Sequence, residues 1–248
     1  MNGGRPRVVI IGGGFAGFSA ARVFRTAAVD VTLVDRTNHH LFQPLLYQVA
    51  TATLAPSDIS APIRWLLRHQ RNTTVLLGAA AAVDVARRVV VLEDGRELPY
   101  DYLIVATGTH HSYFGHDEWE RYAPGLKSID DALEMRRRFL LAFEEAENAT
   151  DEAERVALLT FVIVGGGPTG VELAGMLPEV ARHAMHEDFR RVDTSRTRVI
   201  LVEGGPRVLP TYPEELSEHA RRDLEELGVE VRTGSIVTAV DEEGVMIA

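Results

Sequence analysis

Two copies of one glycine-rich motif constrain the fold of this 248-residue chain more than any other feature. The first reads VVIIGGGFAG over residues 8–17, and the second reads FVIVGGGPTG over residues 161–170. In each copy a run of β-branched residues predicts a buried parallel strand, and the glycines predict a tight turn into an amphipathic helix. Such a turn lets the backbone approach a pyrophosphate at the helix N-terminus. The doubled motif therefore predicts two dinucleotide sites in one chain.

The glycines of the two motifs form three pairs with different expected roles. One pair makes the turn, one omits the Cβ that would block a phosphate, and one lets helix and strand pack closely. In that order the pairs are Gly12 and Gly165, Gly14 and Gly167, and Gly17 and Gly170. A single motif of this kind would be weak evidence, but both copies follow an apolar strand and precede a second strand that ends in an acid.

These two acids are candidate ribose ligands. Asp35 ends the strand of residues 31–35, roughly twenty residues after the first glycines, which is the spacing expected of a ribose-binding carboxylate. Glu203 ends the strand of residues 199–203 at a longer spacing, because residues 179–197 lengthen the helix and its return. We expect each acid to bind an adenosine ribose. The alternative for both is a solvated strand end.

The internal repeat extends beyond the motifs. After Asp35 the pattern predicts a strand at residues 74–77, an antiparallel hairpin and a closing strand, YLIVATG, at residues 102–108. After Glu203 it predicts a strand at residues 229–232 and a hairpin turn, but no closing strand. The expected fold class is α/β, with two Rossmann-like dinucleotide-binding domains, each a parallel sheet with an antiparallel meander. We place these domains at residues 1–125 and 126–248 and expect the second to be truncated.

Helical periodicity predicts two further helices. Residues 129–149 carry apolar residues at helical spacing after Ser128, a typical N-cap residue. Residues 213–227 begin near two glutamates and stop before Gly228, so both ends carry capping signals. In the helix after the second motif, Pro178 should produce a kink, because proline lacks the N–H group and clashes with the preceding turn.

The charge balance limits the classes of partner. A formal net charge of −10 argues against nucleic acid and against broad attraction to an anionic membrane surface. No apolar run reaches the roughly 18 residues that a transmembrane helix needs, and the N-terminus shows no signal-peptide pattern. We therefore expect a cytoplasmic chain.

Residue types also limit the chemistry. Cysteine is absent, which excludes disulfides, thiolate metal sites and a redox dithiol beside a flavin. Electrons would then pass from cofactor to substrate without a protein sulfur. His39 and His40 are adjacent, but no spaced third ligand accompanies them, so no metal site is predicted.

Further motifs give the chain a family resemblance. The segment NHHLFQPLLYQVATATLAPSDISAPIR, residues 38–64, occurs together with GGGFAG, ATGT, GGGPTGVELAG and LVEGGPRVLP. With these motifs the chain resembles, over essentially its whole length, the bacterial type II NADH dehydrogenases, single-polypeptide NADH:quinone oxidoreductases that pump no protons. The glycine motifs alone fit many flavin-dependent pyridine-nucleotide oxidoreductases. The segment FQPLLYQVATA is what narrows the resemblance to the type II NADH dehydrogenases.

The resemblance implies that the first domain binds FAD and the second binds NADH. It implies an FAD site in which Val83 contacts the adenine through its backbone. The FAD residues would be Gly12, Gly14, Ala16, Gly17, Asp35, Arg36, Val83, Ala106, Thr107 and Gly108. The NADH residues would be Gly165, Gly167, Pro168, Thr169, Gly170 and Glu203.

Two candidate catalytic residues follow from the same resemblance. Glu172 would lie beside nicotinamide and flavin and relay a proton for quinone reduction, with ordinary stabilisation of a helix N-terminus as the alternative. Gln48 belongs to a loop that resembles the one reaching the isoalloxazine, so it is a candidate polar contact on the flavin or quinone side. The alternative for this loop is packing of the first domain.

The function implied is transfer of a hydride from NADH to FAD and of electrons onward to a membrane quinone. A C-terminal region absent from this sequence would bind the membrane, which makes the full-length protein peripheral on the inner face of the cell membrane. We accordingly expect this N-terminal portion to be poorly active alone. A homodimer is left open. Two other functions also stay open, a soluble NADH-dependent flavoprotein reductase of a redox protein and a nucleotide-binding module without turnover.

Overall fold

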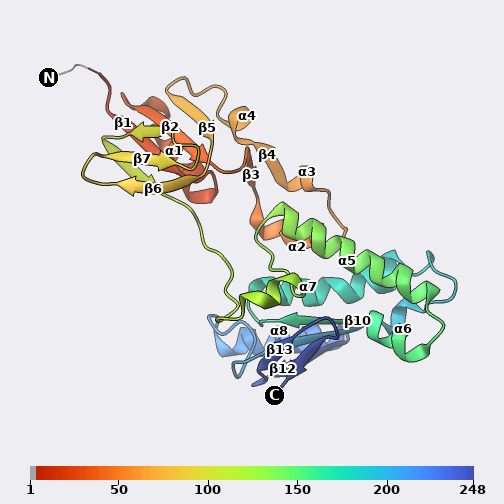
Figure 1. The fold of residues 1–248 in the computed structure, drawn as a ribbon. Helices are drawn as coiled ribbons and strands as arrows, with labels where there is room; N and C mark the ends of the chain where they lie inside the picture. Colours follow the sequence, from red (N-terminus) through yellow and green to blue (C-terminus); the bar gives the residue numbers. More distant parts are fainter. Residues whose placement is uncertain (1–3) are drawn as a thin grey trace. The chain divides into compact units, whose positions relative to one another are not determined.

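The computed structural model describes residues 4–248, and these divide into two compact units (Figure 1). Unit 1 comprises the described residues up to Phe42 together with Ser57–His110. Unit 2 comprises Gln43–Pro56 and His111–Ala248. These units differ from the expected ranges 1–125 and 126–248 by two segments, residues 43–56 and 111–125. The assignment of those ranges to two cofactors stays a prediction.

Unit 1 is built on a parallel sheet with the strand order β5-β2-β1-β9. Its strands are β1 (Arg7–Ile11), β2 (Asp30–Asp35), β5 (Thr73–Leu77) and β9 (Tyr102–Val105). An antiparallel meander of β6 (Ala80–Asp84), β7 (Val89–Leu92) and β8 (Glu97–Pro99) accompanies it. The closing strand stops at Val105 rather than Gly108, because β1 ends at Ile11 and offers one last carbonyl, to the Ala106 N–H.

Alternate residues of β1 are buried in two different clusters. Val8 and Ile10 pack with residues of α1 (Phe15–Val23). Val9 lies in a different apolar cluster, with Val90 and Leu92 of the meander. A sheet covered on both faces needs apolar residues at successive positions, which explains the continuous run in the first motif. Shorter elements complete the unit. They are η1 (Phe24–Thr26), β3 (His39–Leu41), α3 (Pro56–Ile59), β4 (Ser60–Pro62) and α4 (Ile63–Leu66).

Unit 2 repeats the parallel arrangement with β10 (Thr160–Val164), β11 (Arg198–Glu203) and β12 (Val229–Thr233). A hairpin of β13 (Val237–Val240) and β14 (Val245–Ile247) follows. Its main helices are α2 (Leu46–Ala50), α5 (Ile129–Asn148), α6 (Glu152–Leu158), α7 (Pro168–Glu179) and α8 (Glu214–Glu226). Short turns lie at η2 (Gln43–Leu45), η3 (Asp117–Arg121) and η5 (Thr194–Arg196). Phe143 is fully buried in its core. The predicted α/β fold with two parallel sheets is confirmed, with a three-stranded antiparallel meander in unit 1 and a two-stranded hairpin in unit 2.

Helix α7 runs through Pro178 and then widens into a π-helical turn, η4 (Val180–Ala184). The Met185 N–H donates to the Val180 carbonyl at 3.1 Å, which is the wider spacing of such a turn. Proline cannot donate to the carbonyl one turn earlier, so the regular ladder is interrupted there. The expected irregularity therefore takes the form of a π turn directly after the proline.

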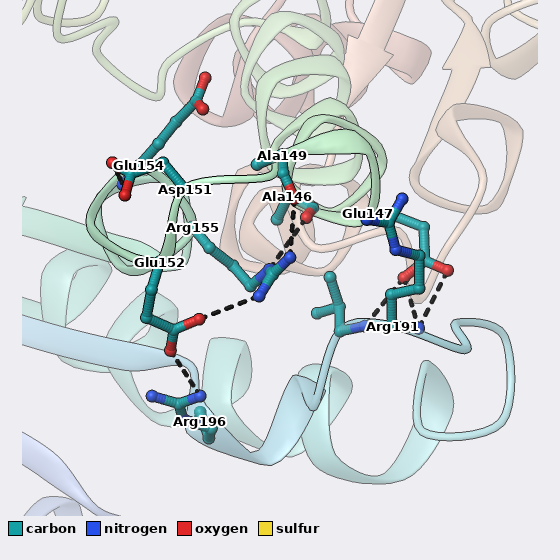
Figure 2. A network of polar contacts seen from close by, with 10 residues as sticks. Ala146, Glu147, Ala149, Asp151, Glu152, Glu154, Arg155, Arg191 and Arg196 are labelled. Atoms are coloured by element: carbon teal, nitrogen blue, oxygen red, sulfur yellow. Dashed lines mark hydrogen bonds and ion pairs between the residues drawn. The ribbon is translucent and has the colours of Figure 1, made fainter.

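The long return from α7 to β11 is fastened to the end of α5 (Figure 2). The Glu147 carboxylate accepts the backbone N–H groups of Arg190, Arg191 and Val192 at 2.8–3.1 Å. Glu152 on α6 pairs with Arg196 at 2.8 Å and with Arg155. Hydrogen bonds and an ion pair to α5 and α6 therefore hold the long connection between α7 and β11 in place.

The N-terminus of α5 provides a simple test of local stability. Ser128 accepts the Asp131 N–H at 3.1 Å, and the Asp131 carboxylate accepts the Ser128 N–H at 2.8 Å, which forms a capping box. Ser128→Ala should lower the free energy of unfolding by about 1 kcal/mol, the usual cost of losing such a cap. Urea unfolding followed by circular dichroism measures it. Ser195→Ala is the control for losing a serine hydroxyl bond outside a capping box, because the exposed Ser195 donates to the Asp193 carboxylate at 2.6 Å in η5. Equal losses would argue against a special role for the cap.

Candidate dinucleotide sites

The first glycine loop is closed by contacts that admit no side chain. Gly12 has φ of +102°, and a Cβ there would overlap the carbonyl oxygen of Ala106. A Cβ on Gly17 would overlap the carbonyl oxygen of Gly12 itself. The sequence therefore places glycine where β1, α1 and the chain leaving β9 meet. The same contacts bring Ala106 to the loop, as expected for a residue lining this site.

Asp35 holds the first loop from the end of β2. Its carboxylate accepts the Gly13 N–H at 2.5 Å, and the Thr37 N–H and hydroxyl at 2.6 and 2.7 Å. Gly13 is also held from its other side, because His40 Nδ1 donates to the Gly13 carbonyl at 2.9 Å. The Gly13 backbone is thus fixed through both its N–H and its C=O. Sequence reasoning missed His40, because its position beside His39 suggested only the question of a metal ligand.

The second loop repeats this arrangement with different residues. The Glu203 carboxylate accepts the Gly166 N–H and the Gly205 N–H, each at 2.6 Å. A Cβ on Gly170 would overlap the carbonyl oxygen of Gly165, as at the first loop. Asp35 and Glu203 therefore have equivalent positions at their strand ends, although their spacing from the glycines differs.

Each loop also contains a glycine that faces open space. A Cβ on Gly14 or Gly167 would meet no heavy atom within 4 Å. These two residues are the N-caps of α1 and α7, and neither helix has a side-chain cap. Free N–H groups and the positive end of the helix dipole form an anion site. The loops therefore fit a pyrophosphate, with Ala16, Pro168 and Thr169 exposed in the first turns.

The remaining FAD candidates lie at separate places on unit 1. Val83 is partly exposed on β6, and Thr107 and Gly108 are exposed after β9. Arg36 is exposed and has no ion pair among the residues that the structure describes. Contact of these four residues with a cofactor stays a prediction.

Both candidate catalytic residues belong to unit 2, on helices that touch each other. Gln48 lies on α2, which contacts α5 and α7 and on which Leu46 and Val49 are buried. Its amide donates to the Tyr47 hydroxyl at 3.2 Å. Glu172 lies on α7 and forms no hydrogen bond or ion pair with any described residue. The residue as a whole is exposed to solvent, but neighbouring atoms partly desolvate its carboxyl group, and this raises the pKa of Glu172.

Two compact units, each with a glycine loop clamped by the acid of the next strand, define a protein with two dinucleotide sites. The chain belongs to the pyridine nucleotide-disulphide oxidoreductase family, whose sequence pattern matches residues 6–248. Despite the family name it contains no cysteine.

The resemblance to type II NADH dehydrogenases is confirmed by two mycobacterial relatives. The chain is 50% identical over 246 residues to the type II NADH:quinone oxidoreductase Ndh of Mycobacterium tuberculosis, covering 98% of this chain and 53% of the relative. It is 51% identical over 248 residues to NdhA of the same organism, covering 99% and 53%. The chain therefore spans about half the length of the curated relatives it matches.

A solved structure supports the same likeness. NDH2 from Plasmodium falciparum in complex with NADH has a TM-score of 0.90 and 27% identity, covering 98% of this chain and 51% of that chain. Among residues 4–248, no helix combines the length and apolar character needed to cross a membrane.

Proposed function

We propose that this protein is an FAD-dependent NADH:quinone oxidoreductase. The observation that carries the proposal is the pair of clamped glycine loops, one in each unit, in a chain half identical to type II NADH:quinone oxidoreductases. FAD, when bound, would take a hydride from NADH and pass two electrons to quinone. Unit 1 would hold FAD, and unit 2 would hold NADH.

The role of unit 1 is to bind and orient the adenosine and pyrophosphate of FAD. The open face of Gly14 and the free N–H groups of α1 would receive the pyrophosphate. Asp35 would contact the ribose while it fixes the loop through Gly13. His40 would support the loop from behind, as a positioning residue that touches no cofactor atom.

The role of unit 2 is to bind NADH and to supply polar groups for quinone reduction. Gly167 and the N-terminus of α7 would receive the second pyrophosphate, and Glu203 the second ribose. Glu172 and Gln48 would be the groups nearest the chemistry. Attachment to a membrane surface and assembly as a homodimer stay predictions.

Flavin content and electron acceptor test the proposal. The protein purified at the full length of its relatives should carry flavin absorbance, and its NADH oxidation should be faster with a soluble quinone than with a redox-protein acceptor such as a ferredoxin. Absence of flavin after incubation with FAD would indicate a nucleotide-binding module without turnover. Faster reduction of the protein acceptor would indicate a soluble reductase instead.

Glu172→Gln separates a proton relay from a structural carboxylate. Because burial raises the Glu172 pKa above 4.5, its protonated form persists to higher pH than usual and is lost as pH rises through the raised pKa. The variant should keep FAD, because Glu172 lies in unit 2, and should slow quinone turnover about tenfold or more while leaving flavin reduction by NADH nearly unchanged. Stopped-flow measurement of the two half-reactions across pH checks this.

Glu179→Gln is the matched control, since it removes an exposed carboxylate from the same helix. If Glu172 donates a proton, the wild-type rate of quinone reduction falls as pH rises through the raised pKa, and the Glu172 variant lacks this limb. Equal behaviour of both variants would return Glu172 to a role at the helix N-terminus.

A further inference from the structure

The two glycine loops hold their middle glycine at equivalent atoms but with different donors. In unit 1, His40 Nδ1 donates to the Gly13 carbonyl at 2.9 Å. In unit 2, the backbone N–H of Leu209 donates to the Gly166 carbonyl at 2.7 Å. Each glycine also gives its own N–H to the acid of the neighbouring strand. The carbonyl is therefore held by a side chain in the first loop and by the main chain in the second.

Leu209 reaches its glycine in a conformation that leucine rarely adopts. Its φ is +47°, in the left-handed region. A residue other than glycine pays a conformational cost there and stays only where the surrounding contacts hold it. The hydrogen bond to the Gly166 carbonyl is one such contact. Since an imidazole in one loop and a strained backbone in the other satisfy the same carbonyl, the direction of that carbonyl matters in both loops.

The His40 ring is fixed from two elements of unit 1. Strand β3 pairs with β4 and places His40 opposite Ala61. The ring centroid lies 4.7 Å from that of Phe18 and 5.4 Å, edge to face, from that of Phe15, both on α1. A carbonyl oxygen can only accept a hydrogen bond, so the proton is on Nδ1. β3 and α1 therefore present His40 to the loop as a donor.

The peptide unit between Gly13 and Gly14 carries the effect of this hydrogen bond. Its carbonyl and its N–H point in opposite directions, because the peptide is planar and trans. Gly14 is the N-cap of α1, where N–H groups without a partner in the helix can bind an anion. A Cβ on Gly13 would overlap the Ile63 side chain, so this glycine is enclosed on a third side. Fixing the Gly13 carbonyl therefore also fixes the direction of the Gly14 N–H.

We propose that His40 positions the FAD pyrophosphate by directing the Gly14 N–H through the Gly13 carbonyl. The inference rests on the proposed function and deepens it, because FAD affinity then depends on one side-chain donor that touches no cofactor atom. NADH affinity does not depend on that donor, since the equivalent group in unit 2 is the Leu209 main chain.

Two substitutions separate the donor of His40 from its ring. His40→Asn keeps a nitrogen donor, Nδ2, at the position of Nδ1 but loses the ring, whereas His40→Phe keeps the ring and has no donor. The protein at the full length of its relatives is freed of flavin and titrated with FAD. His40→Phe should raise the FAD Kd about tenfold and His40→Asn at most about threefold, in keeping with the contribution of one hydrogen bond. The Kd of NADH should stay the same in both variants.

His39→Phe is the matched control. His39 precedes His40 on β3, and successive side chains of a strand point to opposite faces of the sheet, so this change should leave the FAD Kd unaltered. An FAD Kd that is unchanged in His40→Phe would overturn the proposal. A greater loss in His40→Asn than in His40→Phe would also overturn it, because the ring and not the donor would then support the site. So would an equal rise in the Kd of FAD and of NADH.

Hydrogen exchange measures the loop without cofactor. Amides in the peptide covering residues 8–18 should exchange faster in His40→Phe than in the wild type, and His40→Asn should restore the slower exchange. A wild-type protein that binds no FAD would contradict the proposed function. A wild type that binds FAD, with equal exchange in all three proteins, would contradict only the inference about His40.

Discussion

Gly17→Ala should abolish FAD binding by unfolding the first loop or forcing it open. The added Cβ would overlap the Gly12 carbonyl oxygen, and backbone atoms on both sides leave little freedom to move. We expect the free energy of unfolding to fall by about 3 kcal/mol, at the upper end of the cost of overpacking. Urea unfolding and flavin absorbance after equilibration with FAD measure the two effects.

Gly14→Ala is the matched substitution, three positions earlier in the same loop. Its Cβ would enter open space, and replacing a glycine N-cap by alanine costs about 1 kcal/mol or less, well below the cost expected for Gly17→Ala. This variant should keep most of its stability but bind FAD at least about tenfold more weakly, because the Cβ occupies the approach of the pyrophosphate. Unchanged FAD affinity in Gly14→Ala would place the pyrophosphate elsewhere.

NADH should bind at least about tenfold more tightly than NADPH, because the Glu203 carboxylate would pair with a ribose hydroxyl and repel a 2′-phosphate. Glu203→Gln should remove most of this preference. It should also weaken the clamp, since a carboxylate now accepts both the Gly166 and Gly205 N–H groups. Titration with each coenzyme, with unfolding measured in parallel, separates specificity from stability.

Arg207 supplies the control for coenzyme preference. An arginine near Glu203 could neutralise the repulsion of a phosphate, but here Arg207 donates to the Pro210 carbonyl at 3.1 Å and lies 3.9 Å from Glu214. Arg207→Gln should therefore leave the preference for NADH unchanged. Equal or better binding of NADPH by the wild type would contradict the role given to Glu203.

Local patterns were sufficient to predict the parallel strands, the glycine turns and the acids at the strand ends. Each depends on residues close in sequence, and even the unusual spacing of Glu203 did not hide its strand pattern. The contact of His40 with Gly13 was not predictable, because it depends on how β3 packs against the loop. The contact between the end of α1 and the chain around Gln70 and Asn72 was not predictable for the same reason, since these segments become neighbours only through tertiary hydrogen bonds.

The placement of residues 43–56 in unit 2 has a consequence for synthesis on the ribosome. Leu46 and Val49 are buried on α2, but the helices that α2 contacts, α5 and α7, begin only at Ile129 and Pro168. These apolar side chains therefore leave the ribosome before α5 and α7 are synthesised, at a time when most of unit 1 is made. Chain elongation at roughly 5–20 residues per second makes this delay several seconds. During that interval we expect the exposed apolar side chains of this nascent segment to be bound by a chaperone.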